Sequence, residues 1–177
     1  MDENFWKNAY HQTWSDASER ERGLIEMIQK VTGADVIENG LGTGSNNFIN
    51  GNAASNGYQK GDPDLRVKGT DIYIEVTGPL STNISVLAPL WFRPDKLNNA
   101  IKNMSAHDTF LAHHCPSLNL WRVIHIDVQF SERCYNHEFK VVHPSIRGNT
   151  ERYVEIPADD KCIRDIGYLM CYIKKNT

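Results

Sequence analysis

The stretch from Gly61 to Gly78 constrains the fold of this chain more than any other. Apolar residues occupy alternate positions between Ile72 and Val76, which is the two-residue period of a β-strand. The pair Lys68-Gly69 predicts a turn before this strand, and a partner strand starts at Asp64. The hairpin brings Asp64 beside Glu75. Two carboxylates held on rigid strands can bind a hard divalent cation such as Mg²⁺.

The residues Pro63-Asp64 and Glu75-Val76-Thr77 resemble the motif of the PD-(D/E)xK nuclease superfamily, the fold of many restriction enzymes and archaeal Holliday-junction resolvases. Pro63, Asp64 and Glu75 match the motif in type, order and spacing, whereas Thr77 stands where the motif has lysine. The resemblance covers roughly residues 17 to 130. It implies Mg²⁺ or Mn²⁺ held by Asp64, Glu75 and the backbone carbonyl of Val76. The alternative is a surface hairpin with solvated acids.

A helix is predicted from Ser15 to Gly33, where Ser15 supplies capping chemistry and glycine ends the helix. Its apolar stripe runs through Leu24, Ile25, Ile28 and Val31. Glu21 lies on that inward stripe, where a carboxylate is costly unless it is paired or binds a metal. The resemblance implies a further acidic residue on this helix. We assign that metal-binding and catalytic role to Glu21, with Glu19 or Glu26 as substitutes; pairing of Glu21 with Arg20 or Arg22 is the alternative.

A helix is predicted to start at Pro94, because proline is favoured in the first turn of a helix. This helix could supply the lysine that the motif lacks. Some relatives in this superfamily supply the cation from the helix that follows the strand. Lys96 is then the expected catalytic lysine, and Thr77 would hydrogen-bond the attacking water. Arg93 is the second candidate and an expected substrate contact, and Lys60 and Lys68 are further candidates for the lysine. A surface role for Lys96 is the alternative.

Residues 40–61 form a long segment rich in Gly and Asn, and a loop of this length is usually functional or mobile. It lacks the Gly-Lys-Ser/Thr ending of a P-loop, which excludes that type of nucleotide binding. Its amides and Lys60 are expected to contact a nucleic-acid backbone, or else the loop is an ordinary surface loop. Residues 1–14 are predicted to be a short amphipathic helix or an arm.

The rest of the chain predicts further sheet and a final helix. The histidines at 113, 114 and 125, with the adjacent cysteine, suggest zinc; neighbouring residues of a strand face opposite ways, which favours structural roles instead. Asp159-Asp160 is expected to cap the final helix, and a terminal strand is its alternative. The predicted strands are 34–38, 109–114, 121–130, 138–142 and 152–156. The final helix is expected to carry Ile163, Ile166, Leu169, Met170 and Ile173, and the alternative strand spans 168–173.

The composition indicates one soluble domain spanning 1–177, with a net charge of −3 that argues against a protein coating nucleic acid through a basic surface. No apolar run is long enough to span a membrane, and the acidic N-terminus has no apolar signal region, so a cytoplasmic protein is expected. The four cysteines are expected to be free thiols, mostly buried.

Together these features predict an α/β, restriction-endonuclease-like fold, a mixed sheet flanked by helices. The expected function is metal-dependent cleavage of DNA, of a restriction, repair, recombination or phage-defence type, by a homodimer where both strands are cut. The alternative is a catalytically degenerate nuclease-fold protein that binds nucleic acid or a protein partner. A third interpretation, a protein that mimics or inhibits a nuclease, predicts no metal affinity.

Overall fold

The computed structural model describes residues 3–39, 61–79, 84–146 and 148–177, with the side chains of the first helix described from Ser15 onward. Within these ranges, no helix is both long and apolar enough to cross a membrane. The elements, in chain order, are α1 (Glu3–Thr32), β1 (Val36–Glu38), β2 (Leu65–Val67), β3 (Ile72–Thr77), β4 (Leu90–Phe92), α2 (Pro94–Asn103), β5 (Asp108–Cys115), η2 (Pro116–Leu118), β6 (Leu120–His125), α3 (Val128–Tyr135), β7 (Lys140–Val142), β8 (Ser145–Ile146), β9 (Asn149–Thr150), β10 (Tyr153–Ile156), β11 (Arg164–Asp165) and α4 (Ile166–Asn176).

The described strands form one large mixed sheet and two small ones. The main sheet has the order β1-β2-β3-β5-β6-β11. Its central pair, β3 with β5, is parallel, and every other neighbouring pair in it is antiparallel. Strands β4, β10 and β7 form a separate antiparallel sheet, and β8 pairs with β9. The mixed sheet flanked by helices confirms the predicted fold class.

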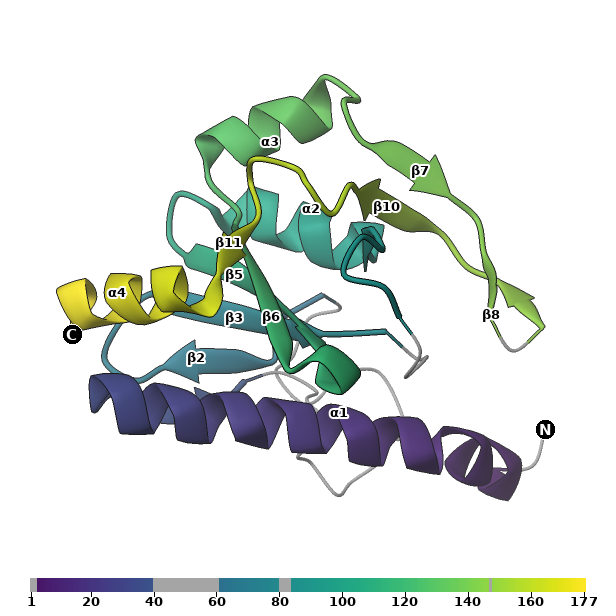
Figure 1. The fold of residues 1–177 in the computed structure, drawn as a ribbon, viewed down its shortest axis with the longest axis horizontal. Helices are drawn as coiled ribbons and strands as arrows, with labels where there is room; N and C mark the ends of the chain where they lie inside the picture. Colours follow the sequence, from purple (N-terminus) through teal and green to yellow (C-terminus); the bar gives the residue numbers. More distant parts are fainter. Residues whose placement is uncertain (1–2, 40–60, 80–83, 147) are drawn as a thin grey trace.

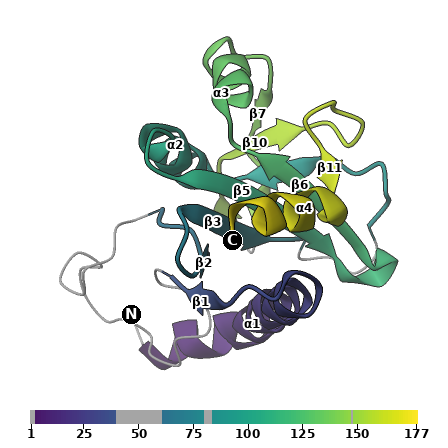
Figure 2. The same ribbon diagram turned by 90° about the vertical axis from the view of Figure 1, so that its left-hand side faces the viewer.

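Helices cover both faces of the main sheet (Figure 1). Helices α1 and α4 lie over one face, while α2, α3 and the small sheet lie over the other, as the turned view also shows (Figure 2). Strand β3 therefore sends alternate side chains into two different cores: Ile74 packs beneath α1, and Glu75 faces α2. This alternation puts a carboxylate on the side of the sheet where α2 begins.

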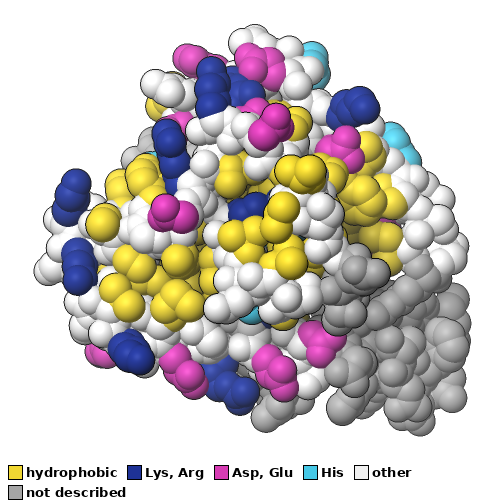
Figure 3. Space-filling view, viewed as in Figure 1, with side chains coloured by type: hydrophobic (Ala, Val, Ile, Leu, Met, Phe, Trp, Pro, Cys, Tyr) yellow, Lys and Arg dark blue, Asp and Glu magenta, His cyan; other side chains and the backbone are white. Residues whose placement is uncertain are grey.

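Charge on the face drawn in Figure 3 is mixed rather than uniformly basic. Hydrophobic side chains gather over α4 and the adjoining part of the sheet, and charged side chains of both signs lie over α1 and α3. This distribution agrees with the small negative net charge of the chain.

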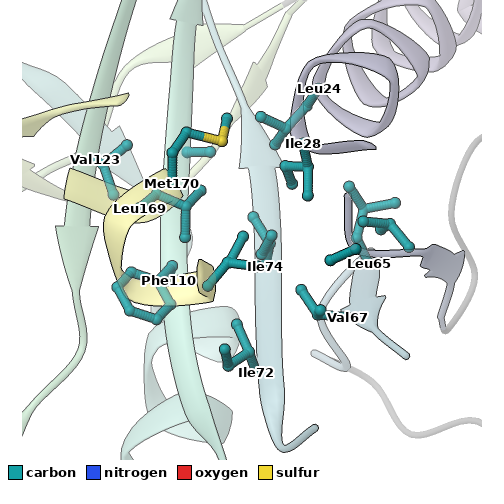
Figure 4. Packing of buried hydrophobic residues seen from close by; sticks show 14 of the residues in the cluster. Leu24, Ile28, Leu65, Val67, Ile72, Ile74, Phe110, Val123, Leu169 and Met170 are labelled. Atoms are coloured by element: carbon teal, nitrogen blue, oxygen red, sulfur yellow. The ribbon is translucent and has the colours of Figure 1, made fainter. Parts of the chain in front are cut away.

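The core beneath α1 and α4 fixes the position of the hairpin. Leu24 and Ile28 of α1 point at Leu65 and Ile74 of the two hairpin strands (Figure 4), and all four side chains are fully buried. Fully burying one such aliphatic side chain stabilises the fold by about 1.5–3 kcal/mol. The hairpin that carries the two predicted acids is therefore held from beneath by α1.

The hairpin itself forms as the sequence predicts. Leu65 pairs with Ile74, and Gly69 takes a φ of +80° in the turn, which a residue with a Cβ rarely adopts. The Thr70 hydroxyl donates to the Val67 carbonyl at 2.9 Å and accepts from the Ile72 amide at 3.1 Å. These local bonds fix the register that sets Asp64 against β3.

Helix α1 is longer than predicted, because it is continuous from Glu3 instead of starting at Ser15. No glycine or proline interrupts the sequence between Glu3 and Arg22, so capping residues at 15 and 18 alone do not start a new helix there. Residues 3–14 are therefore part of α1, neither a separate helix nor an extended arm.

The predicted strand 121–130 is wrong in its second half. Strand β6 ends at His125, and helix α3 begins at Val128. The Asp127 side chain accepts a hydrogen bond from the Phe130 amide at 2.8 Å, which is N-terminal capping of that helix. The apolar run alone could not distinguish a strand from a buried helix.

The structure differs from several predictions for the C-terminal part of the chain and for the cysteines. Asp165, not Asp159 or Asp160, caps the final helix, and residues 168–173 are helical, so the alternative strand is wrong. Residues 138–142 and 152–156 were expected to be edge strands; β7 lies at the edge of the small sheet, whereas β10 is its central strand. The four cysteines are free, but Cys115 alone is fully buried and Cys171 is exposed.

Candidate active site

Asp64 and Glu75 meet at the edge where β2 starts. The Asp64 carboxylate accepts a hydrogen bond from the Val76 amide at 2.8 Å, which anchors it to β3. The Asp64 and Glu75 side chains are largely buried, with exposed fractions of 14% and 15%. The structure therefore brings the two predicted carboxylates together, through the strand pairing on which the sequence prediction relied.

Lys96 enters this pair from the first turn of α2. Its ammonium lies 2.8 Å from Glu75 Oε2 and 3.5 Å from Asp64 Oδ1, and it donates to the Asp62 carbonyl at 2.9 Å. Pro94 sets the start of the helix, and Leu97 is buried beneath it, so the turn that carries Lys96 has a fixed orientation. The sequence candidate for the displaced lysine thus contacts both acids.

The positive charge of Lys96 does not fully compensate the negative charges of Asp64 and Glu75. Burial and the neighbouring Asp64 carboxylate raise the pKa of Glu75 well above its usual value of 4.5, although Lys96 acts to lower it. Burial acts to lower the pKa of Lys96, but Glu75 and Asp64 outweigh that effect and raise it. One ammonium does not fully compensate two adjacent buried carboxylates, so further positive charge is favourable here.

The donor atoms at this edge suit a hard cation. Because the amide and carbonyl of one strand residue point to the same side, the Val76 amide bond to Asp64 directs the Val76 carbonyl towards that edge too. Two carboxylates and one carbonyl are the small oxygen set with which Mg²⁺ combines water and substrate phosphate. The residues present therefore fit Mg²⁺ or Mn²⁺ in donor chemistry.

Helix α2 also clamps the segment that leads into Asp64. The Asn99 side chain donates to the Gly61 carbonyl at 2.8 Å, one helical turn beyond Lys96. Gly61 has a φ of +96°, and a Cβ there would lie 2.9 Å from the Asp95 carbonyl oxygen. This clamp was not predicted from the sequence. The spacing of three residues between Lys96 and Asn99, which puts both on one helix face, was the available signal.

A crevice of about 10 Å³ lies between Glu75, Lys96 and Thr109. The Thr109 hydroxyl is buried and makes no hydrogen bond within the described residues. A space of this size holds about one water molecule.

Glu21 is buried on α1, as its place on the stripe predicted, with an exposed fraction of 4%. However, among the described residues no three His, Cys, Asp or Glu side chains form a group that could hold a metal ion. Glu21 therefore does not complete a three-carboxylate site with Asp64 and Glu75. The substitutes Glu19 and Glu26 are exposed.

The remaining predicted residues lie at different places in the structure. Arg93 is half-exposed and its guanidinium binds Asp95, with Nε and a terminal nitrogen donating at 3.1 and 2.6 Å. Lys68 lies 3.7 Å from Asp35 on the surface, and Thr77 ends β3 on the face shared with Glu75. Lys60 and residues 40–60 lie outside the described residues.

The histidines of β5 have structural partners on opposite faces. His113 contacts Arg122 and Cys115, at 3.4 and 3.6 Å, whereas His114 stacks on Trp121 with ring centroids 4.1 Å apart. This arrangement agrees with the strand alternation expected for the pair.

Comparisons with known proteins support the fold. No protein-family model matches the sequence, and no curated protein matches it either. Among solved structures, the chain is similar to a nuclease from a fusselovirus, with a TM-score of 0.52 and 13% sequence identity. The match covers 90% of this chain and 89% of the viral protein. At this identity, the likeness shows a shared nuclease-like fold.

Proposed function

We propose that the chain is a metal-dependent nuclease that hydrolyses phosphodiester bonds of DNA. The observation that carries the proposal is the meeting of Asp64, Glu75 and Lys96 at one edge of the sheet. Asp64 and Glu75 come from one hairpin and Lys96 joins them from α2, and their electrostatic imbalance favours an additional cation. The nuclease-like fold supports the same function, although fold alone does not fix function.

Asp64, Glu75 and the Val76 carbonyl are the groups that would hold Mg²⁺ or Mn²⁺. When bound, such an ion lowers the pKa of water and stabilises charge on the attacked phosphate. Two protein carboxylates leave room for water and substrate phosphate around the ion. We do not include Glu21 in this set, because the structure gathers it into no metal-binding group with the other two.

Lys96 would supply the positive charge that the motif lysine gives in relatives with the full pattern. Its ammonium is fixed by the Asp62 carbonyl and by Glu75, so it can donate a hydrogen bond in a set direction without a large reorganisation. Thr77 lies on the same strand face and would hydrogen-bond the attacking water. A neutral hydroxyl does not remove a proton at neutral pH, so Thr77 orients the water and does not act as the base.

A second function is a nuclease-fold protein that binds nucleic acid without cutting it. The favouring observation is that Lys96 already forms ion pairs with both acids while holding the Asp62 carbonyl. This contact set would fasten the segment before β2 to α2 without any metal.

The test is cleavage of supercoiled plasmid, single-stranded DNA and a branched junction in Mg²⁺ or Mn²⁺ by wild type, Asp64→Asn and Lys96→Ala. We expect Asp64→Asn to abolish cleavage and Lys96→Ala to reduce it strongly. Matched controls are Asp71→Asn, an exposed acid of the same hairpin, and Lys102→Ala, an exposed lysine of the same helix. Both controls should cleave as wild type does.

Cleavage that persists in Asp64→Asn would locate the chemistry elsewhere. No cleavage of any substrate by wild type, with no Mn²⁺ binding by calorimetry, would leave the non-cutting binding protein as the function. Calorimetry on Asp64→Asn separates these cases, because the nuclease proposal requires that this variant also loses Mn²⁺ affinity.

A further inference from the structure

A cavity of about 700 Å³ opens at the carboxyl end of β3, directly after the candidate active site. Val76 and Thr77 line it, and Thr77 lies two residues beyond Glu75 on the same face, about 7 Å along the strand. Residues of α1, β4, β5 and β10 form other parts of its wall. A substrate strand that passes the two carboxylates would therefore meet this cavity within about one nucleotide.

Arg20 of α1 contributes a half-buried positive charge to the wall. Its guanidinium packs against the backbone of Gly78, where an added Cβ would lie 2.8 Å from Arg20 Cζ and would overlap the His114 carbonyl oxygen. The buried Nε makes no hydrogen bond within the described residues. A glycine at this position thus lets the chain pass close to a guanidinium, which can pair with one phosphate.

His113 adds a neutral polar group to the same wall. Burial and the neighbouring Arg122 lower the pKa of His113 to about 3, so the ring is uncharged at neutral pH. Arg122 contacts His113 Nδ1 at 3.4 Å and can only donate, which favours the tautomer that carries its proton on Nε2. His113 is only 4% exposed, so it gives the wall an uncharged polar surface and leaves charge recognition to the arginine.

Trp91 and Tyr153 give the cavity an aromatic side, with ring centroids 5.8 Å apart. Trp91 Nε1 donates to Glu155 at 2.9 Å and the Tyr153 hydroxyl donates to Glu151 at 2.6 Å, so the polar atoms of both rings are held by protein groups. Trp91 remains 39% exposed although it is a large hydrophobic side chain. Exposed aromatic faces of this kind stack on bases of single strands.

We propose that this cavity binds one nucleotide of an unpaired DNA strand, next to the phosphate that is cut; the proposal rests on the function inferred above. The cavity volume lies within the range of about 300–1,000 Å³ that is usual for ligand sites. Two arginines, Arg20 and Arg93, and two acids, Asp16 and Glu151, line it. Arg93 is already bound to Asp95, so the wall favours a base with one phosphate over a run of phosphates. A base inside a duplex would have to leave its stack to enter, so unpaired DNA is preferred.

The experiment measures binding separately from cleavage. Anisotropy of a labelled eight-nucleotide oligothymidylate and of a duplex of equal length is recorded in Ca²⁺ and again in EDTA. The variants are Trp91→Ala, Trp91→Phe and Arg20→Ala. The controls are Tyr135→Ala, an aromatic residue that is 85% exposed, and Arg164→Ala on β11, at the far edge of the main sheet. Circular dichroism confirms that each variant is folded.

We expect the single strand to bind more tightly than the duplex. Trp91→Ala should weaken that binding by about 5- to 150-fold, which is the usual contribution of one stacked base, and Trp91→Phe should recover most of it. Arg20→Ala should weaken binding of the phosphate-bearing strand, and the two controls should not. Equal affinity for single strand and duplex, or an unchanged affinity in Trp91→Ala, would overturn the cavity proposal.

The cavity proposal and the nuclease proposal can fail separately, and the measurements distinguish the two cases. If cleavage depends on Asp64 while Trp91→Ala binds as wild type does, the nuclease stands and the cavity proposal fails. If nothing is cut while Trp91→Ala still weakens single-strand binding, the cavity binds nucleotides in a protein that does not cut, and the location beside a scissile phosphate is wrong.

Discussion

Two clusters in this molecule each hold one cation between two carboxylates. The pKa of a carboxyl group is raised in one cluster and lowered in the other. At the candidate active site, Lys96 lies between Asp64 and Glu75. In the second cluster, Arg133 of α3 binds Glu138 through Nε at 2.7 Å and Asp160 through both terminal nitrogens at 2.8 Å. The pKa of Glu75 is raised by burial and by Asp64, whereas that of Asp160 is lowered, first by Arg133.

The difference follows first from burial, which is the largest cause of the raised Glu75 pKa, and then from the shape of the cation. A guanidinium has donors on separate edges, so it can face two carboxylates and keep them apart. An ammonium is a point charge, and it leaves Asp64 and Glu75 close enough to repel each other. Arg133 therefore stabilises the charged form of Asp160 without any further cation. In the lysine cluster, a further cation would stabilise the charged form of Glu75. We infer a structural role for the first and a functional role for the second.

The largest expected effect is on catalysis. Glu75→Gln should lower the cleavage rate by about 1,000-fold, equivalent to about 4 kcal/mol, because it removes a carboxylate that would hold the ion. Glu138→Gln, the same change in the arginine cluster, should alter the rate by less than about twofold. Initial rates of plasmid cleavage in Mg²⁺ measure both. Comparable losses in the two variants would remove the distinction between the clusters.

The next effect is on stability. Arg133→Ala leaves Asp160, whose side chain is 11% exposed, without its bidentate partner, and should lower the free energy of unfolding by about 3 kcal/mol. Urea unfolding measures the loss, and adding Mg²⁺ should not restore it. Cleavage at 25 °C should remain close to wild type. A variant that folds well but does not cut would show that this cluster is not merely structural.

The third effect is a gain in the free energy of unfolding when Mg²⁺ is added, which is expected at the lysine cluster and not at the arginine cluster. In EDTA, Lys96→Ala should be destabilised, because both buried acids lose their cation. Mg²⁺ at about 100 times its dissociation constant should return about 2.7 kcal/mol, since the ion binds the folded state alone. Thermal unfolding with and without Mg²⁺ measures this, and the double variant Lys96→Ala, Asp64→Asn is the control. An equal stabilisation of the double variant would contradict a site at Asp64.

The smallest effect is a difference in pH dependence, of about 1.4 kcal/mol per pH unit for one proton. In EDTA, the folded state keeps the Glu75 proton above pH 4.5 while the unfolded state loses it, so this group lowers stability as pH rises from 4.5 to its raised pKa. Asp160 acts oppositely: its contribution is fully present above its usual 3.8 and is lost as pH falls towards its lowered pKa.

Urea unfolding between pH 3 and pH 8 tests these signs. Glu75→Gln should flatten the decline above pH 4.5, and Asp160→Asn should flatten the rise below pH 4. If Glu75→Gln leaves the profile above pH 4.5 unchanged, the acid is not held in an unfavourable charged environment, and the proposed need for a cation weakens.

Part of the candidate site could be predicted because it depends on neighbours in the chain. Alternation along β3, a glycine in the turn and a short partner strand put Asp64 beside Glu75 without reference to other elements. Lys96 was identified from its place after Pro94 and from a resemblance, and its contact with both acids required the packing of α2 on the sheet.

Other features could not be predicted because they depend on long-range packing or on competition between local structures. The apolar run after Trp121 fits a strand and a helix equally, and capping by Asp127 decides the point where one becomes the other. Glu21 was correctly expected to be buried, but where a buried side chain lies relative to a strand depends on how α1 crosses the sheet.

The sequence by itself determined the hairpin, the fold class and the meeting of two acids, because strand period and turn chemistry act over a few residues. Only the tertiary structure decided that Lys96 reaches both acids, that Glu21 does not form a metal-binding group with them, and that Arg20, Trp91 and Tyr153 line one cavity after β3. Those contacts join α1, α2 and two sheets, and no local pattern specifies the distance between elements that pack across a core.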